Sequence, residues 1–295
     1  MNVRSTIPQR LFDIANGVVL LLFGAVMIYP FLNLLALSLN DGADAARGGI
    51  YIFPREFSLD AYKLLMQNSQ MLEGFGWSVL RVIVGTSTAL FVTGLLAYVV
   101  SIRLFSGRKF MRILFLVTMY FNGGLIPIYL LMVNLKLIDS FHVYWIPSLI
   151  SAYYMLLMSS YIQELPEALF ESARIDGASE MKIYMRLVIP MAIPVFAAIF
   201  IYSAVSHWNA WFDVVLYNSS GNYDTLQVYL RRLLLEVEAS QQIMDQQLLY
   251  QKFNSLSPLT LRAATTIVVT VPILLVYPFL QKYFIGGLTI GSVKG

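Results

Sequence analysis

The sequence of 295 residues contains no cysteine and only two histidines, His142 and His207. Without cysteine the chain has no disulfide, no thiolate metal site and no cysteine nucleophile, and two histidines leave little scope for metal chemistry. Charged residues are also scarce: they make up 13% of the sequence, whereas roughly 25% is usual in soluble globular proteins. Together with a hydrophobic content of 58%, this scarcity excludes an ordinary soluble domain and indicates a membrane protein.

The charges that are present sum to a net charge of only +3. A nucleic-acid surface needs dense, clustered positive charge, so nucleic acid is excluded as a partner. The sequence also lacks a glycine-rich loop that ends in Gly-Lys-Ser or Gly-Lys-Thr, the pattern that cradles nucleotide phosphates. The chain is therefore expected to bind no cofactor and to hydrolyse no ATP itself.

Stretches free of charge define the expected architecture. A helix needs about 20 apolar residues to cross the hydrocarbon core of a bilayer. Uniformly apolar stretches of this length favour helices over the alternating strands of a membrane β-barrel. The sequence therefore predicts an all-α, polytopic membrane protein with six transmembrane helices, at residues 14–40, 82–102, 113–135, 140–163, 187–212 and 263–281.

Lysine and arginine in the short loops predict the orientation of these spans. The loop after the second span contains Arg103, Arg108, Lys109 and Arg112, whereas the loop after the third contains only Lys136. Because positive charge is enriched on the cytoplasmic side, the former loop is expected to be cytoplasmic. Six crossings then place both termini in the cytoplasm and make residues 41–81 and 213–262 the two large external loops.

The predicted spans contain no Asp, Glu, Lys or Arg, and Arg81 is expected at the mouth of the second span. Ion-coupled carriers usually place ionisable groups near the membrane midplane, so their absence argues against an ion-driven carrier. It also argues against a membrane-embedded enzyme, which needs acid–base or nucleophilic groups. Neutral polar residues in the spans suit a hydroxyl-rich solute, although they also hold membrane helices together. Four methionines, Met119, Met132, Met155 and Met158, are expected to be packing residues.

The most informative segment is the predicted cytoplasmic loop 164–190. Pro166 and Glu167 suit the first turn of a helix, and Gly177 suits its end, since glycine adopts a left-handed conformation at no steric cost. Ser179 is suited to cap a second helix that leads into the fifth span. The expected product is a short amphipathic helix, a glycine turn and another helix, which would lie on lipid or dock into a groove of another protein.

This loop resembles the EAA motif of ABC-importer permease subunits, which reads Glu-Ala-Ala, three residues, Gly, nine residues, Ile-x-Leu-Pro. The corresponding residues here are Glu171-Ser-Ala173, Gly177 and Leu187-Val-Ile-Pro190, with the same spacing and small departures at three positions. The segments Phe121-Asn-Gly-Gly-Leu-Ile-Pro127 and Trp208-Asn-Ala-Trp-Phe-Asp213 and the tail 283–295 point the same way. The chain is similar to the maltose-type carbohydrate permeases, closest to the branch for oligosaccharides and polysaccharide fragments that includes the alginate importer.

The resemblance implies a type I ABC-importer permease fold in the bacterial inner membrane, with residues 1–76 forming an N-terminal helix and external loop and residues 77–295 the permease core. It implies that the loop 164–190 couples to the ATPase. The partners would be a second homologous permease, two ATP-binding subunits that hold ATP and magnesium, an extracytoplasmic sugar-binding protein, and membrane lipid. The coupling residues that it assigns are Glu171, Ala173, Arg174, Asp176, Gly177 and Pro190.

Within this family resemblance, Ala173 would allow close approach, Gly177 the turn, and Glu171 a charge-assisted hydrogen bond to the ATPase. Arg174 and Asp176 would pair with each other, with the partner, or form a solvated surface pair. The tail 286–295 is a second candidate for the ATPase interface. The external loop 218–258 resembles in placement the loop that probes the binding protein in maltose-type importers.

Aromatic rings that stack on sugars and amides that read hydroxyl groups are the candidates for the solute pathway. Such aromatic residues at span ends also form interfacial belts, which is the alternative interpretation. The pathway candidates are Asn122, Tyr153, Tyr154, Trp208, Asn209 and Trp211. Two other functions stay open: a permease for another polar solute such as a glycerol phosphate, which would call for cationic groups facing the pathway, and an ion-independent secondary sugar carrier.

Overall fold

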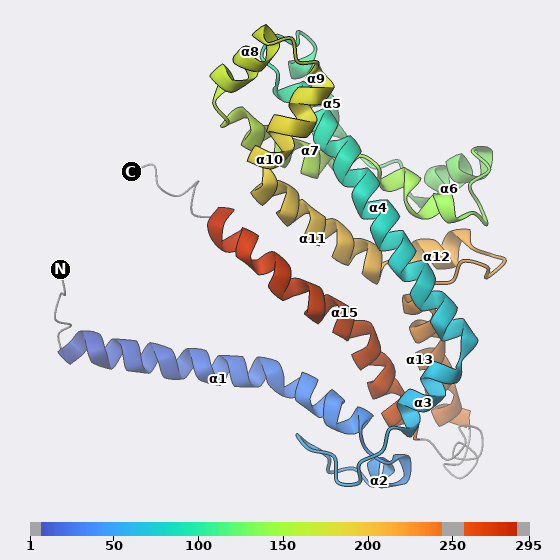
Figure 1. Cartoon of the computed structure of the whole chain (residues 1–295). Helices are drawn as coiled ribbons and strands as arrows, with labels where there is room; N and C mark the ends of the chain where they lie inside the picture. Colours follow the sequence, from blue (N-terminus) through green and yellow to red (C-terminus); the bar gives the residue numbers. More distant parts are fainter. Residues whose placement is uncertain (1–6, 244–256, 288–295) are drawn as a thin grey trace. The chain divides into compact units, whose positions relative to one another are not determined.

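The structure is a computed structural model that describes residues 7–243 and 257–287 (Figure 1). The described residues form helices joined by short loops, and their only strand-like pairing is an isolated antiparallel bridge between Asn40 and Phe57. They fall into two compact units, residues 7–69 with 230–243 and 257–271, and residues 70–229 with 272–287. The prediction of an all-α chain is confirmed for this part of the sequence.

The first unit begins with α1 (Ile7–Ser38), followed by α2 (Gly42–Ala46) and α3 (Asp60–Gln67). The side chain of Asp41 accepts hydrogen bonds from two backbone N–H groups at the start of α2 and thereby caps it. Large apolar side chains along α1 are exposed, which water would disfavour but the hydrocarbon of a bilayer accommodates. The composition of α1 therefore fits a membrane span.

The second unit contains most of the remaining helices, which Figure 1 shows in chain order. Long α4 is followed by shorter elements, several of which meet at sharp bends. The elements after α3 are α4 (Ser69–Ser101), α5 (Arg108–Tyr120), α6 (Leu125–Asn134), η1 (Phe141–Tyr144), η2 (Ile146–Ser148), α7 (Ala152–Gln163), α8 (Glu167–Ile175), α9 (Glu180–Ile183), η3 (Tyr184–Val188), α10 (Ile189–Met191), α11 (Ile193–Asn209), α12 (Phe212–Tyr217), α13 (Leu226–Ile243) and α15 (Pro258–Gly287).

Three of the six predicted spans are single helices long and apolar enough to cross a bilayer: α1, α4 and α15. The other three predicted spans are not continuous helices. Each is a pair of helical segments bent by 116° (α5 and α6), 46° (η1–η2 and α7) or 85° (α9–α10 and α11). The described residues therefore provide three spans, or up to six if each bent pair counts as one.

Local chemistry explains the sharpest bends. Between α5 and α6, Gly124 has a φ of +88°, and its N–H donates to the side chain of Asn122 over 3.0 Å. This left-handed turn is open to glycine but costly for other residues. Between α10 and α11, Pro190 and Pro194 lie in the first turns of their helices and flank the bend, and proline removes a backbone donor that a continuous helix would use.

Two apolar clusters occupy the second unit. The larger lies where α4, α7, η3 and α11 meet and includes Tyr98, Met155 and Tyr184, each at most 2% exposed. The smaller brings α6, η1 and α12 together around Met132 and Val214. The predicted packing role is confirmed for Met132, Met155 and Met158, whereas Met119 is 42% exposed. In Figure 1, α8 and α9 lie near the C-terminal end of α4, and α12 lies nearer its N-terminal end.

Candidate functional site

The loop that follows α7 forms the helix–turn–helix expected from its sequence. Helix α8 begins at Glu167, directly after Pro166, and the carboxylate of Glu167 lies at the positive end of the helix dipole. Glu167 also pairs with Arg103, with 2.9 Å between the carboxylate and guanidinium atoms. This surface pair links the start of α8 to the segment that leaves α4.

A glycine turn ends α8 as predicted. Gly177 has a φ of +77°, and its N–H donates to the carbonyl of Arg174 over 3.0 Å. The next N–H, of Ala178, reaches back to the carbonyl of Ala173 over 2.9 Å. These two bonds form a Schellman motif, which satisfies carbonyls that the end of a helix would otherwise leave unpaired. The turn thus depends on the one residue type that adopts this conformation without strain.

The second helix of the loop starts with the predicted cap. The side chain of Ser179 accepts a hydrogen bond from the backbone N–H of Lys182, and α9 follows at once. The helix then widens into the π-helical turn η3, continues as α10, and turns by 85° into α11. Pro190, one of the predicted coupling residues, lies in α10 just before this bend and is exposed.

A polar network braces the turn. Nε of Arg174 donates to Oε1 of Glu180 over 2.8 Å, and the hydroxyl of Tyr98 on α4 donates to Oε2 of the same carboxylate. The hydrogen bond from Arg174 lowers the pKa of Glu180, and the same bond raises the pKa of Arg174. Arg174 therefore forms its ion pair with Glu180 and not with Asp176, which was one of the predicted partners. The side chain of Asp176 is exposed.

The two faces of α8 differ. Phe170 is buried and lies 6.4 Å from the ring of Tyr98, centroid to centroid. Ala173 is partly buried against the same apolar cluster, so its small size lets α8 approach the rest of this chain, and its predicted approach to a partner stays a prediction. The opposite face exposes Leu169, Glu171 and Ile175, the last with 86% of its surface accessible. An exposed face with apolar and acidic side chains suits contact with another protein.

The predicted pathway residues do not form one cluster. Asn122 lies in the turn between α5 and α6, where its amide oxygen accepts the N–H of Gly124. Tyr153 and Tyr154 are neighbours on α7 with ring centroids 5.8 Å apart; Tyr153 is exposed, whereas Tyr154 is half-buried. The hydrogen bond within the turn therefore explains the presence of Asn122 without contact to a solute. Of these three residues, only Tyr154 lines the polar cavity described below.

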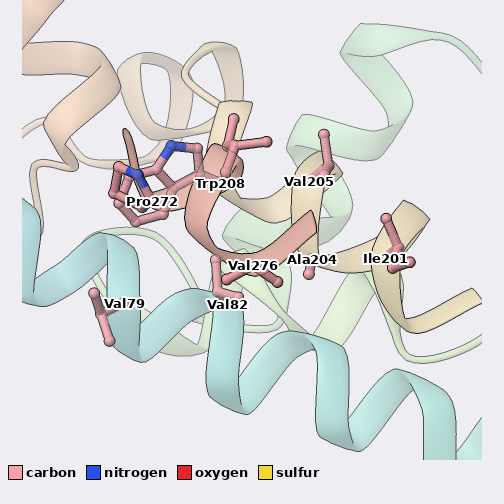
Figure 2. A pocket seen from close by; sticks show the side chains of 9 residues that line it. Val79, Val82, Ile201, Ala204, Val205, Trp208, Pro272 and Val276 are labelled. Carbon is pink, nitrogen blue, oxygen red and sulfur yellow. The ribbon is translucent and has the colours of Figure 1, made fainter. Parts of the chain in front are cut away.

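The remaining pathway candidates lie at the end of α11. Figure 2 shows Trp208 among aliphatic side chains of α4, α11 and α15, where it helps to line an apolar pocket of about 210 Å³. Asn209 is exposed and accepts a hydrogen bond from the side chain of Gln227 over 3.2 Å. Trp211 is half-buried and packs against the smaller apolar cluster. The surroundings of Trp208 are those of a packing residue, and no observation tests the predicted contact of these residues with a solute.

A second cavity of about 550 Å³ lies within the second unit; we call it the polar cavity because charged and hydroxyl side chains share its lining with apolar ones. Side chains of α4, η1, α7, α11 and α12 line it, among them Arg81, Tyr144, Tyr154, Ser203, His207 and Asp213. Its volume is in the range of small-molecule sites in proteins. Like the loop around α8, this cavity fits a function beyond packing.

The cavity contains an ion pair between Arg81 and Asp213. Helix α4 starts 12 residues before Arg81, so the helix extends beyond the predicted span at whose mouth this arginine was expected, and the Arg81 side chain is 3% exposed. Both terminal nitrogens of its guanidinium group donate to the carboxylate of Asp213, and the group lies 4.8 Å from the ring centroid of Tyr144. The second unit thus contains an ion pair between a buried arginine and a partly exposed aspartate, a pairing that the sequence did not predict.

Arg81 and Asp213 were not expected to pair, because 132 positions separate them in the sequence. One signal was present: each is a single charge at the end of a predicted span, of opposite sign, and on the same predicted side of the membrane. The tail 286–295, predicted to contact the ATPase, falls mostly outside the described residues, and so does the part of the predicted external loop 218–258 that covers residues 244–256.

Comparison with known proteins identifies the family. The family model described as "Binding-protein-dependent transport system inner membrane component" matches residues 91–289. Protein LplC of Bacillus subtilis (strain 168) is 35% identical over 294 residues, which cover 99% of this chain and 98% of LplC. The polygalacturonan/rhamnogalacturonan transport system permease protein YtcP of the same organism is 33% identical and aligns over 97% of this chain and 99% of its own length.

A solved structure has the same fold. One chain of a bacterial ABC transporter involved in the import of the acidic polysaccharide alginate is 27% identical, with a TM-score of 0.87 over 96% of this chain and 100% of that chain. The matches extend over nearly the whole sequence, and the family model covers both the loop around α8 and Asp213. The chain therefore belongs to the inner membrane components of binding-protein-dependent transport systems, the permease subunits of ABC importers.

Proposed function

We propose that the chain is one of two transmembrane subunits of an ATP-driven importer in the bacterial inner membrane. It would carry oligosaccharides or polysaccharide fragments that an extracytoplasmic sugar-binding protein delivers. The names of its relatives support a sugar substrate, since YtcP belongs to a polygalacturonan and rhamnogalacturonan system and the structural neighbour to an alginate importer. The partners would be a second permease and two subunits that bind ATP and magnesium.

The observation that carries this proposal is the loop of α8, Gly177 and α9. Its inner face is tied to α4 through Phe170 and Glu180, whereas its outer face exposes Glu171 and Ile175. If an ATPase binds the exposed outer face of α8, a movement of the ATPase can displace α8 and, through its inner face, α4. Closure of the ATPase and docking of the loaded binding protein would then bias the same two-state helix bundle.

We further propose six spans with both termini in the cytoplasm. Three single helices and three bent pairs support this number when each pair is one span. The lysines and arginines around residues 103–112 support a cytoplasmic position for that loop, and hence for the loop around α8. Residues 1–76 would be the N-terminal helix with its external loop, and residues 77–295 the permease core.

An anionic solute such as a glycerol phosphate would need a cationic group that faces the pathway. Arg81 does face a cavity, but both of its terminal nitrogens already donate to Asp213. The pair is neutral as a whole, so it does not favour an anion over an uncharged sugar. A secondary sugar carrier would need no ATPase and leaves the exposed face of α8 without a purpose.

Reconstitution in proteoliposomes tests the proposed function. The chain, its partner permease and the ATPase subunits should hydrolyse ATP faster when the binding protein and an oligosaccharide are added together. Glu171→Lys reverses an exposed charge on α8 and should reduce this stimulation while basal hydrolysis persists. Glu73→Lys makes the same charge change at an exposed position of α4 and serves as the matched control. Stimulation that is unchanged by Glu171→Lys would contradict the coupling role, and sugar uptake by the chain without any ATPase would favour a secondary carrier.

A further inference from the structure

The polar cavity of the second unit contains an acceptor group that is held in a fixed position. Oδ1 of Asp213 accepts from Nη1 of Arg81 over 3.2 Å and from the backbone N–H of Val214 over 3.0 Å, and Oδ2 accepts from Nη2 of Arg81. Each carboxylate oxygen offers two lone pairs, so Oδ2 retains acceptor capacity. The side chain of Asp213 is 29% exposed, whereas that of Arg81 is 3% exposed. The carboxylate is thus the partner that the cavity can reach.

Arg81 fixes this carboxylate from behind. Its guanidinium group binds both oxygens, a bidentate geometry that sets the orientation of the carboxylate as well as its position. The ring of Tyr144, at 4.8 Å, lies against the guanidinium group. Arg81 comes from α4 and Asp213 from the start of α12, so the pair also joins two elements of the same unit.

The rest of the lining is partly apolar and adds hydroxyl groups to this acceptor. Ser151, Tyr154, Ser203 and Ser206 line the cavity from α7, its preceding residue and α11. Hydroxyl groups donate and accept, and therefore complement the hydroxyl groups of a sugar ring. Although the pair is neutral as a whole, a solute that brings its own carboxylate would meet the exposed oxygens of Asp213, whereas the guanidinium group that balances them is buried behind them.

We propose that this cavity binds an uncharged sugar ring of the transported solute, with Asp213 accepting hydrogen bonds from its hydroxyl groups and Arg81 acting as the positioning residue. The proposal rests on the proposed function, because it takes the solute to be a sugar. In the topology proposed above, Arg81, Tyr144 and Asp213 lie at the external ends of three spans. The cavity is then the first part of this chain that a sugar meets after it leaves the binding protein.

Direct binding to the purified transporter complex, with the binding protein omitted, tests this site. Two trisaccharide probes are built from the same type of ring and differ in one group on each ring: galactotriose is uncharged, whereas trigalacturonate carries a carboxylate on every ring. Isothermal calorimetry should show that the complex binds galactotriose more tightly than trigalacturonate. Asp213→Asn should weaken galactotriose binding about tenfold or more, as expected for loss of a hydrogen bond to a charged group.

Asp213→Asn leaves Arg81 buried without its counterion and could disturb folding, so two further variants are required. The double variant Arg81→Gln with Asp213→Asn removes both charges and keeps an amide at each position, and Ser203→Ala removes one hydroxyl group from the cavity. Both should keep the elution volume and melting temperature of the complex, while both weaken galactotriose binding. A pair that only joins α4 to α12 would predict wild-type binding in the double variant once folding is restored.

Three results would overturn the proposal: no galactotriose binding by the wild-type complex, equal or tighter binding of trigalacturonate, or wild-type affinity in the double and Ser203→Ala variants. None of them touches the proposed function, which is tested by ATP hydrolysis that depends on the binding protein and a sugar. If no sugar stimulates hydrolysis in that assay, the proposed function fails, and this inference fails with it.

Discussion

Substitution of Gly177 isolates the contribution of one backbone conformation to coupling. Gly177 has a φ of +77°, and a Cβ atom built there would have no neighbour within 4 Å. The cost of Gly177→Ala is therefore conformational and not steric. A left-handed L-residue costs roughly 1–2 kcal/mol. This cost lowers the ratio of intact to unwound turn by about 5- to 30-fold.

A series of substitutions at Gly177 should reduce coupling to different, predictable degrees. Asparagine tolerates the left-handed conformation better than alanine, so Gly177→Asn should be milder than Gly177→Ala. Proline fixes φ at a negative value and removes the N–H that donates to the carbonyl of Arg174, so Gly177→Pro should cost about 3 kcal/mol or more. Coupling should fall in the order Gly, Asn, Ala, Pro.

The assay is the ratio of stimulated to basal ATP hydrolysis in proteoliposomes, with the amount of assembled complex measured in parallel. Gly76→Ala is the matched control, because a Cβ at Gly76 on α4 also has no neighbour within 4 Å but the backbone there is helical. We expect the ratio to follow the order above and to be unchanged by Gly76→Ala. Full stimulation in both the alanine and the proline variants would refute the reasoning that this turn transmits the signal.

Three further predictions follow from contacts in the second unit. Arg174 lowers the pKa of Glu180 below its ordinary 4.5, so the stability that this pair contributes is present above pH 4.5 and is lost as the pH falls through the lowered pKa. Glu180→Gln should abolish this acid dependence of the melting temperature. Because the pair is exposed, the variant should lose at most about 1 kcal/mol of stability. Gly94→Ala would place a Cβ 2.6 Å from the hydroxyl of Tyr184 and should destabilise the complex by about 1–3 kcal/mol, measured as a lower melting temperature; an unchanged melt would contradict the close approach of these elements. Asn122→Ala removes the bond to Gly124 and should reduce transport, whereas Asn122→Asp keeps the acceptor and should preserve it; loss of sugar uptake in both variants would instead support a pathway role.

The loop around α8 shows how far local sequence carries a prediction. Its end at Gly177 and the cap at Ser179 were expected and are confirmed, whereas Pro166, expected in the first turn, is the N-cap residue directly before it. Each depends on the conformational or hydrogen-bonding preference of one residue, which acts over three or four positions. The membrane class follows from composition in the same way, because apolar stretches of span length have few other uses.

The bends within three predicted spans were not expected, although the glycines and prolines at these bends are visible in the sequence. Phe121-Asn-Gly-Gly124 was noted as a family signature, yet an apolar count alone treats glycine and proline in a span as neutral. Proline and glycine are tolerated in membrane helices when neighbouring groups satisfy the freed backbone atoms. Whether they bend a helix depends on those neighbours, which the local sequence does not reveal.

The sequence by itself determined the helical membrane architecture, the position of the coupling-type loop and its caps, because these depend on neighbours along the chain. The tertiary structure alone decided which face of α8 points inward and that Arg81 pairs with Asp213 in a polar cavity. The physical reason is distance along the sequence. A charge at position 81 is costly in a buried helix until a carboxylate from position 213 neutralises it, and only the folded chain brings the two together.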